Sequence, residues 1–376
     1  MNPVFKGMLE DRESRKYIKY ELPARPYEIQ DGMECLGIRE AEHMNFEITE
    51  YLEYQYLEPC IPPTAEGEEL QKLNFLARRL GELENWQKVT FEGMVEMEMA
   101  RKEEISLERL IDLSYSTGSC HVLREVKNDF QLGKFCVANG FITALEDIPE
   151  EAMKYLDYEK IGREYREEMG GVITEGGYVE KWEEPQISAG RDFNLSDPQY
   201  TVLLETGTKR VPLPMAEKEL EFCLWDADGE YQCLDCAVPF LVKAIEEAGD
   251  IEEINRFAGM LEEVEKQGQM QVYKAVLQAT KCRRIEQAEE LGSNLEEEYV
   301  LFHEKGNPIE IARDWLSEQY PDDIELFSEE DLYHIGQRYM EKYPTIKTEY
   351  GYLQRYDLEP IQPLEEEPEA EIGPQL

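Results

Sequence analysis

Basic side chains are scarce in this sequence. Among its 376 residues, 39 lysines and arginines stand against 83 aspartates and glutamates, which gives a formal net charge of −44. A surface with this charge repels phosphate groups, so nucleic acids and anionic membranes are excluded as principal ligands. The expected partners are therefore cations or the basic surfaces of other proteins.

Long hydrophobic runs are also missing. The longest clean run covers the seven residues from Cys236 to Val242, whereas about 20 apolar residues are needed to span a bilayer. Residues 1–20 are rich in charge and contain no apolar signal-peptide core. The eight cysteines are too dispersed for a dense disulfide framework. A cytoplasmic protein with reduced thiols is the expectation.

Motifs for catalysis or cofactor binding are missing as well. There are four histidines, none in a His-Glu-x-x-His arrangement, and both glycine-rich phosphate-binding patterns are absent. The sequence Asp226-Ala-Asp228-Gly-Glu230 lacks the repeated oxygen ligands of a calcium loop and is typical of a polar turn. The sequence thus predicts neither an enzyme nor a cofactor.

One cysteine pair has the spacing of metal ligands. It is Cys233-x-x-Cys236, and a structural zinc would need two further ligands, for which Cys223 and Cys282 are available in principle. No second close pair exists, so buried thiols in a strand are the favoured interpretation. A zinc-binding protein stays open as the less favoured alternative.

Hydrophobic and aromatic residues are plentiful. They make up 41% and 10% of the chain, which is enough apolar surface for packed cores despite the charge. The length predicts two or three domains. Residues 70–83 form the clearest amphipathic pattern, with leucines and an alanine on one stripe, and predict a helix. Residues 158–168 predict another helix that ends at Gly170, and residues 172–179 predict a hairpin.

Short segments recur in the same order in the two halves of the chain. The matched pairs are Leu22-Pro23 with Leu213-Pro214, Leu70–Leu80 with Ile251–Leu261, Phe91 with Tyr273, Ile161-Gly-Arg-Glu-Tyr165 with Ile335-Gly-Gln-Arg-Tyr339, and Thr174–Tyr178 with Thr348–Tyr352. Such a series indicates an internal duplication. We expect an elongated α+β protein in two tandem copies, in which small sheet and helix modules flank helical middle segments.

The domain boundaries follow from this pattern. The first unit is expected at residues 1–182, with an α/β module to about 65, a mainly helical part at 66–148, and a helix plus hairpin at 149–182. A linker at 183–198 contains two prolines, and the second unit follows at 199–356. Residues 357–376 contain seven acids and no base, which predicts a disordered tail.

Acidic residues recur on the predicted outer faces of helices without matching bases. Like charges one helical turn apart destabilise a helix by about 0.2–0.5 kcal/mol per pair, so the pattern needs a reason, of which solubility is the simplest. The acids are Glu92, Glu96, Glu98, Glu103, Glu104, Glu164, Glu167, Glu168, Glu252, Glu253, Glu262, Glu263, Glu265, Glu286, Glu289, Glu290, Glu296, Glu297 and Glu298.

A sharper explanation is imitation of a polyanion. Duplex DNA carries one charge per ~1.7 Å of axis, so 44 net charges at that density would cover ~75 Å. Both halves contribute, because residues 1–190 hold 40 acids and 22 bases and residues 191–376 hold 43 and 17. A lysine- and arginine-lined DNA channel of another protein would accept such a surface.

One segment resembles a known family. Leu156-Asp-Tyr-Glu-Lys-Ile-Gly-Arg-Glu-Tyr-Arg166, followed by Gly171-Val-Ile-Thr and Gly177-Tyr178, is similar to the C-terminal part of ArdA-type antirestriction proteins. Leu73-Asn74 resembles the Leu-Asn core of that family's central helices. The resemblance implies acidic, elongated, often dimeric proteins of mobile genetic elements. They mimic bent DNA and occupy the DNA-binding surface of type I restriction–modification enzymes. It also adds Asp157 and Glu159 to the expected phosphate mimics.

The leading hypothesis is therefore a non-catalytic DNA mimic that blocks a type I restriction–modification enzyme and possesses no cofactor. The family usually has one unit, so a chain with two leaves a homodimer open. Two alternatives remain: an acidic inhibitor of, or scaffold for, another basic DNA-binding protein, and the zinc protein described above.

Overall fold

The structure of the protein is a computed structural model. It describes residues 2–38, 43–101, 104–145, 149–183, 198–207, 209–224, 231–248, 250–302, 308–319 and 324–364. The chain divides into two compact units. Unit 1 comprises Met1–Ala24 and Glu42–Leu195, and unit 2 comprises Arg25–Ala41 and Ser196–Leu376. A short segment from the N-terminal part of the chain thus belongs to unit 2.

Unit 1 begins with a four-stranded antiparallel sheet. Its order is β2-β1-β3-β4, from strands β1 (Phe5–Asp11), β2 (Tyr17–Leu22), β3 (Met44–Glu50) and β4 (Thr64–Glu66). Side chains of β1 alternate between buried and partly exposed, as expected for a strand with one face on the core. A 3-10 helix, η2 (Leu52–Leu57), leads away from β3.

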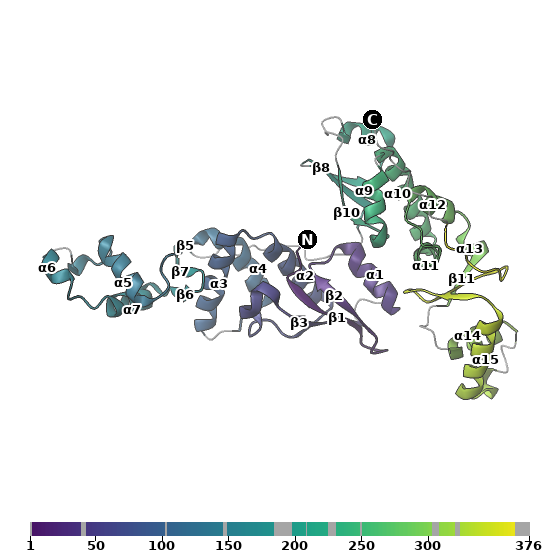
Figure 1. Cartoon of the computed structure of the whole chain (residues 1–376), viewed down its shortest axis with the longest axis horizontal. Coiled ribbons are helices and arrows are strands. Elements are labelled where there is room, and N and C mark those ends of the chain that lie inside the picture. The colour runs from purple at the N-terminus through teal and green to yellow at the C-terminus, as the bar shows by residue number, and fades with distance from the viewer. Residues whose placement is uncertain are drawn as a thin grey trace, which may run out of the picture. The chain divides into compact units, whose positions relative to one another are not determined.

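Helices and a second sheet complete unit 1. The central helices are α2 (Gly67–Gly81), α3 (Asn85–Ala100) and α4 (Leu107–Tyr115), followed by η3 (Thr117–Ser119). The second sheet has the order β5-β7-β6, from β5 (Cys120–Leu123), β6 (Val172–Thr174) and β7 (Gly177–Lys181). Inserted between β5 and β6 are α5 (Asp129–Ala138), η4 (Thr143–Leu145), α6 (Glu150–Met153) and α7 (Tyr158–Met169), which gather beyond this sheet in Figure 1.

Unit 2 is built from similar elements. Its first sheet has the order β10-β8-β9, from β8 (Val202–Thr206), β9 (Lys209–Leu213) and β10 (Gln232–Cys236), and its second has the order β11-β13-β12, from β11 (Tyr299–Phe302), β12 (Thr345–Lys347) and β13 (Tyr352–Arg355). The helices are α1 (Pro26–Leu36), α8 (Glu217–Leu224), η5 (Pro239–Leu241), α9 (Val242–Ala248), α10 (Ile251–Lys266), α11 (Met270–Thr280), α12 (Ile285–Leu291), α13 (Leu295–Glu298), α14 (Pro308–Gln319), η6 (Ile324–Leu326) and α15 (Glu329–Lys342).

The sequence-based expectations of local structure are confirmed at the strongest patterns. The predicted helix at 70–83 is α2, and its leucine stripe is at most 2% exposed at Leu70, Leu73, Leu76 and Leu80. The predicted helix at 158–168 is α7, which ends at Gly170 with φ 65°. The predicted hairpin at 172–179 is the β6–β7 pair, and Gly177, with φ 142°, provides its turn. The fold is mixed α+β with small sheets.

The same local devices occur in both units. Cis peptide bonds precede Pro23 and Pro214. The Asn74 amide accepts from the Ala24 N–H (2.7 Å) and donates to the Ala24 carbonyl (2.9 Å). Asn255 makes the same two bonds, both 2.9 Å, to Met215. Each asparagine satisfies a backbone donor and acceptor next to the cis bond and ties the first sheet to α2 or α10.

Close helix crossings are shared too. A Cβ atom added to Gly162 of α7 would lie 1.8 Å from the carbonyl oxygen of Asp129 in α5. One added to Gly336 of α15 would lie 1.7 Å from the carbonyl oxygen of Pro308 in α14. Only glycine permits these approaches, which explains the Ile-Gly motif that appears once in each half of the sequence.

Several expectations fall outside the described residues. These are most of the linker at 183–198, the tail from residue 365 onward, the polar turn at 226–230, His303 and Glu103. None of the helices in the described ranges is long and apolar enough to cross a membrane.

Candidate functional site: the acidic helix faces

Helix α3 carries two neighbouring glutamates in half-buried positions. Its inner face packs Phe91 and Val95 into the core, which leaves Glu92 and Glu96, one turn apart, at the edge of the packed region. Burial raises the pKa of both carboxyls, and for Glu92 the charges of Glu96 and Glu175 add to the effect. Neither forms a salt bridge with any described residue, and for Glu92 the charge of Lys127 opposes the rise without cancelling it.

Glu98 on the same helix differs from these two. Its side chain is 14% exposed and forms ion pairs with Arg109 of α4 and, at 3.6 Å, with Arg101. Its charge is therefore neutralised inside unit 1. Glu104 is exposed. Of the five acids predicted at residues 92–104, Glu92, Glu96 and Glu104 form no salt bridge with a residue that the structure describes.

Helix α7 carries an exposed acidic face. Close packing of Gly162 on α5 and the ion pair between Arg166 and Asp129 (2.8 Å) fix its inner side. Its predicted site residues are all exposed: Asp157, Glu159, Glu164, Glu167 and Glu168. Asp157 also caps the helix by accepting from the Lys160 N–H (3.0 Å). Lys160 lies 3.7 Å from Glu164, and this surface pair contributes little.

In unit 2 the acids of α10 and α12 come together. Arg256 of α10 lies 3.9 Å from Glu253 and 3.1 Å from Glu289 of α12. Burial raises the pKa of the Glu253 carboxyl, and Glu286 and Glu289 add to this while Arg256 opposes it. One arginine thus serves at least two carboxylates, and the local charge stays negative.

The other predicted acids of unit 2 are spread along α10, α12 and α13. Glu262 and Glu263 share Lys266 at 3.0 and 3.1 Å. Glu296 accepts from the Gln269 amide at 3.1 Å. Most of the set is exposed, namely Glu252, Glu263, Glu265, Glu286, Glu290, Glu296 and Glu297, whereas Glu262 and Glu298 are half-buried. The predicted residues therefore form acidic faces on several helices in both units and do not converge on one pocket.

The cysteine pair lies inside the core. Cys233 and Cys236 are both 0% exposed. Burial raises the pKa of the Cys233 thiol to about 12 and raises the pKa of Cys236 further. Zinc requires thiolates, which this environment disfavours. Within the described ranges, no group of three or more His, Cys, Asp or Glu side chains is arranged to hold a metal ion.

Sequence reasoning missed a buried ion cluster in unit 2. Lys274 of α11 is 0% exposed, and its ammonium lies 2.8 Å from Asp31 and 2.7 Å from Glu34 of α1. The Tyr350 hydroxyl donates to Asp31 at 2.9 Å. A single lysine within the apolar run Val272–Leu277 was the available signal, because a lysine there must be buried with a partner.

Part of the chain is similar to a known protein family. Residues 16–180 match the model of the family described as antirestriction protein (ArdA). The match begins in the first sheet and ends in β7, and it includes the acidic faces of α3 and α7. No curated protein matches the chain. The part of this protein that resembles antirestriction proteins of the ArdA family is therefore residues 16–180.

Proposed function

We propose that this protein is a non-catalytic antirestriction protein that mimics DNA and occupies the DNA-binding channel of a type I restriction–modification enzyme. The observation that carries this proposal is that exposed carboxylates outnumber the neighbouring bases on helices of both units, in a chain with a net charge of −44. The match of residues 16–180 to the ArdA family model supports the antirestriction role. A channel lined by lysine and arginine binds such faces as it binds phosphates, with release of counterions.

The phosphate stand-ins are proposed to be the acids of α3, α7, α10, α12 and α13. Many exposed charges share the interaction, so no single carboxylate dominates it. Members already paired within their unit, such as Glu98, contribute least. The interaction weakens as salt rises, because exposed charges are screened.

We further propose that the chain arose by an internal duplication, with sequence copies at about 1–182 and 199–356 that differ from the two compact units in the placement of α1. The repeated Leu-Pro sequence, the two asparagine bridges and the two glycine crossings support this. Duplication doubles the acidic surface on one chain, and one chain then supplies charge that two single-unit chains would supply together.

An inhibition assay tests the function. Purified protein is added to a type I restriction enzyme with unmodified DNA, and cleavage is expected to fall with increasing protein and to recover with salt. A control variant tests the effect of net charge alone. In it, three exposed glutamates outside the proposed faces are replaced with glutamine, namely Glu47, Glu330 and Glu341. Cleavage that stays undiminished at large molar excess overturns the type I target. Inhibition of other basic DNA-binding proteins under the same conditions would then point to the broader alternative.

A further inference from the structure

Unit 2 holds helix α1 on a defined face. Lys274 binds Asp31 and Glu34, the Tyr350 hydroxyl binds Asp31, and the Asp235 carboxylate faces the start of the helix, 3.4 Å from the Tyr27 N–H. Burial disfavours the Lys274 charge, yet Glu34 and Asp31 outweigh it and raise the pKa of the lysine. We call the face formed by Asp235, Lys274 and Tyr350 the α1 socket.

Strand register identifies the counterpart of Asp235 in unit 1. Phe5 pairs with Leu22, and Val202 pairs with Leu213. Both leucines belong to the repeated Leu-Pro sequence, so the two pairs correspond. In unit 1 the next residue, Lys6, pairs with Glu50. In unit 2 the next residue, Leu203, pairs with Asp235. Glu50 therefore occupies the position of Asp235.

A turn identifies the counterpart of Tyr350. The Thr348 hydroxyl donates to the Gly351 carbonyl (2.8 Å) and accepts from the Tyr350 N–H (3.2 Å). The Thr174 hydroxyl makes the same bonds in unit 1, to the Gly177 carbonyl (3.2 Å) and from the Gly176 N–H (3.1 Å). Gly176 therefore takes the position of Tyr350, and it brings no side chain to that point.

The counterpart of Lys274 is Glu92. Phe91 and Tyr273 are both 0% exposed in the helix that follows α2 or α10, and α3 packs on β5 and β7 as α11 packs on β11 and β13. The residue after each aromatic faces the turn just described. Lys274 lies 5.9 Å from the Tyr350 ring, and the charge of Glu175, beside Gly176, acts on Glu92.

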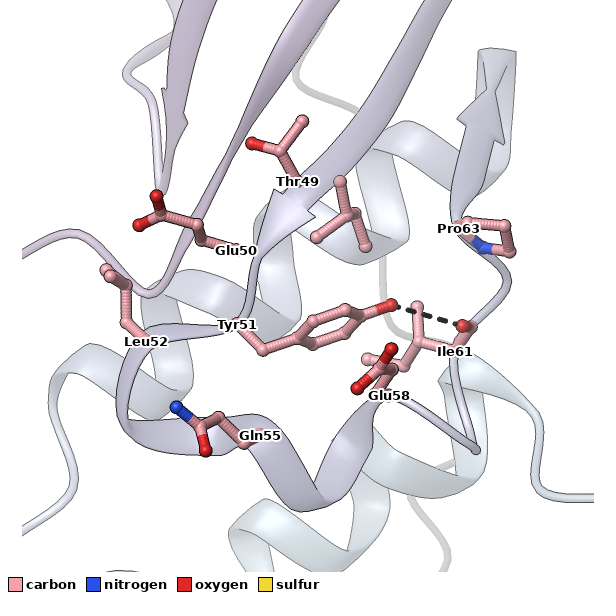
Figure 2. Close-up of a pocket in the computed structure, with 9 residues that line it drawn as sticks. Thr49, Glu50, Tyr51, Leu52, Gln55, Glu58, Ile61 and Pro63 are labelled. Carbon is pink, nitrogen blue, oxygen red and sulfur yellow. Dashed lines mark hydrogen bonds between the residues drawn. The ribbon is translucent and has the colours of Figure 1, made fainter.

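The equivalent face of unit 1 thus carries a carboxylate where unit 2 has Lys274, and it has an open edge. Its cations are Lys6, opposite Glu50 in the sheet, and Lys127, whose charge acts on Glu92. Asp235 is 2% exposed beneath α1, whereas Glu50 is exposed and borders a cavity of about 570 Å³ between β3 and η2. Figure 2 shows this cavity, with Tyr51 crossing it toward Ile61. Close to Glu92 and Glu96, the buried Tyr56 hydroxyl has no hydrogen-bond partner among the described residues.

We infer that this face of unit 1, defined by Glu50, Glu92, Glu96 and Glu175, is a socket for a basic helical segment of a partner protein. The pairing reverses that of α1, because the socket supplies the carboxylates and the helix supplies lysine or arginine. A second copy of this chain does not fit, because the corresponding helices are acidic and would be repelled. Helix α1 carries Asp31 and Glu34, and helix α8 carries Glu217, Glu219 and Glu221. The socket deepens the proposed function by adding one discrete site to the distributed acidic faces, but it is tested without a restriction enzyme.

The probe is a stapled helical peptide with the sequence of residues 25–38, in which the positions of Asp31 and Glu34 carry lysine. Binding to the full-length protein is measured by fluorescence anisotropy at physiological salt, which suppresses non-specific attraction between exposed charges. Glu92→Lys is expected to weaken binding by about tenfold or more, the factor that corresponds to loss of one desolvated charge pair. The matched control, Glu341→Lys, makes the same change of net charge on an exposed site of α15 and is expected to change binding less than about twofold.

A reciprocal measurement guards against misfolding of the variant. Glu92→Lys is expected to gain affinity for the peptide with the native acidic sequence, relative to Glu341→Lys, because it recreates the Lys274 pairing in unit 1. Equal binding of the basic peptide to both lysine variants, or no binding to the unmodified protein, overturns the socket. Either result leaves the inhibition assay unaffected, so the two proposals fail separately.

Discussion

The ammonium group of Lys274 lies 2.7 Å from the carboxylate of Glu34, although 240 residues separate them in the sequence. The lysine belongs to α11, and the glutamate belongs to α1. Helix α1 is part of unit 2, although the chain segments before and after residues 25–41 belong to unit 1. With Asp31 the pair forms a buried cluster that holds α1 in unit 2.

Removal of the lysine charge is expected to destabilise unit 2 strongly. Lys274→Met leaves two largely buried carboxylates without their cation, and breaking a buried pair in this way costs about 3–5 kcal/mol. The free energy of unfolding from urea titration measures the loss. Lys243→Met, at an exposed lysine of α9, is the control and should change stability by less than about 0.5 kcal/mol. Similar effects of both substitutions would contradict a structural role for the cluster.

The pH dependence of stability has an unusual sign at Asp235. Burial raises the pKa of its carboxyl to about 6, above the unfolded value of about 4. The folded state therefore binds the proton first, and this residue makes unit 2 more stable as the pH falls from 7 to 5, by about 1 kcal/mol. Asp235→Asn should remove that increment, seen as the difference between the two proteins in urea titrations at both pH values. An unchanged pH dependence in the variant would show that Asp235 does not titrate between pH 5 and 7 in the folded state.

The helix crossing in unit 1 should not accept a methyl group. In Gly162→Ala the new Cβ would lie 1.8 Å from a backbone oxygen of α5, so α5 and α7 must move apart, at a cost of roughly 1–3 kcal/mol or more. Faster amide hydrogen exchange in α5 and α7 would report it. Gly118→Ala is the control, because nothing lies within 4 Å of its added Cβ. Equal exchange in the two variants would contradict the close packing.

The two asparagine bridges should respond alike if the units are duplicates. Asn74→Ala and Asn255→Ala each leave a backbone donor and acceptor without partners, which costs about 1–3 kcal/mol where these groups are buried. Asn74 is 0% exposed and Asn255 is half-buried, so the loss is expected to be larger in unit 1. Thermal unfolding followed by calorimetry measures both, and a neutral result at both sites would remove this support for duplication.

The proposed phosphate mimics should differ in how much they contribute to inhibition, according to whether a neighbouring base already neutralises their charge. Glu98 is neutralised by Arg109 and Arg101, whereas Glu167 is exposed and makes no salt bridge to a described residue. Glu167→Gln is therefore expected to weaken inhibition of a type I enzyme slightly, and Glu98→Gln is expected to weaken it less. Combining Glu167→Gln with changes at Glu159 and Glu168 should enlarge the loss gradually. A complete loss from one substitution would contradict distributed mimicry.

The sequence by itself determined the features that depend on local pattern. The leucine stripe of α2 and the turn glycine of the β6–β7 hairpin were predictable, because hydrophobic periodicity and glycine conformations act over a few residues. The excess of acids is likewise a property of composition. The Ile-Gly motifs were visible as a repeat, but their reason, the contact of Gly162 with α5, appeared only in the packed helices.

Tertiary structure decided which carboxylates are free and where α1 lies. Glu98 and Glu167 are both glutamates on predicted outer helix faces, and the positions of Arg109 and Arg101 beside Glu98 separate their roles. The spacing around residues 27–36 predicted a helix, yet its place in unit 2 depends on Lys274, Asp235 and Tyr350. Such contacts join residues hundreds of positions apart, and their energies come from burial and charge pairing that no local pattern contains.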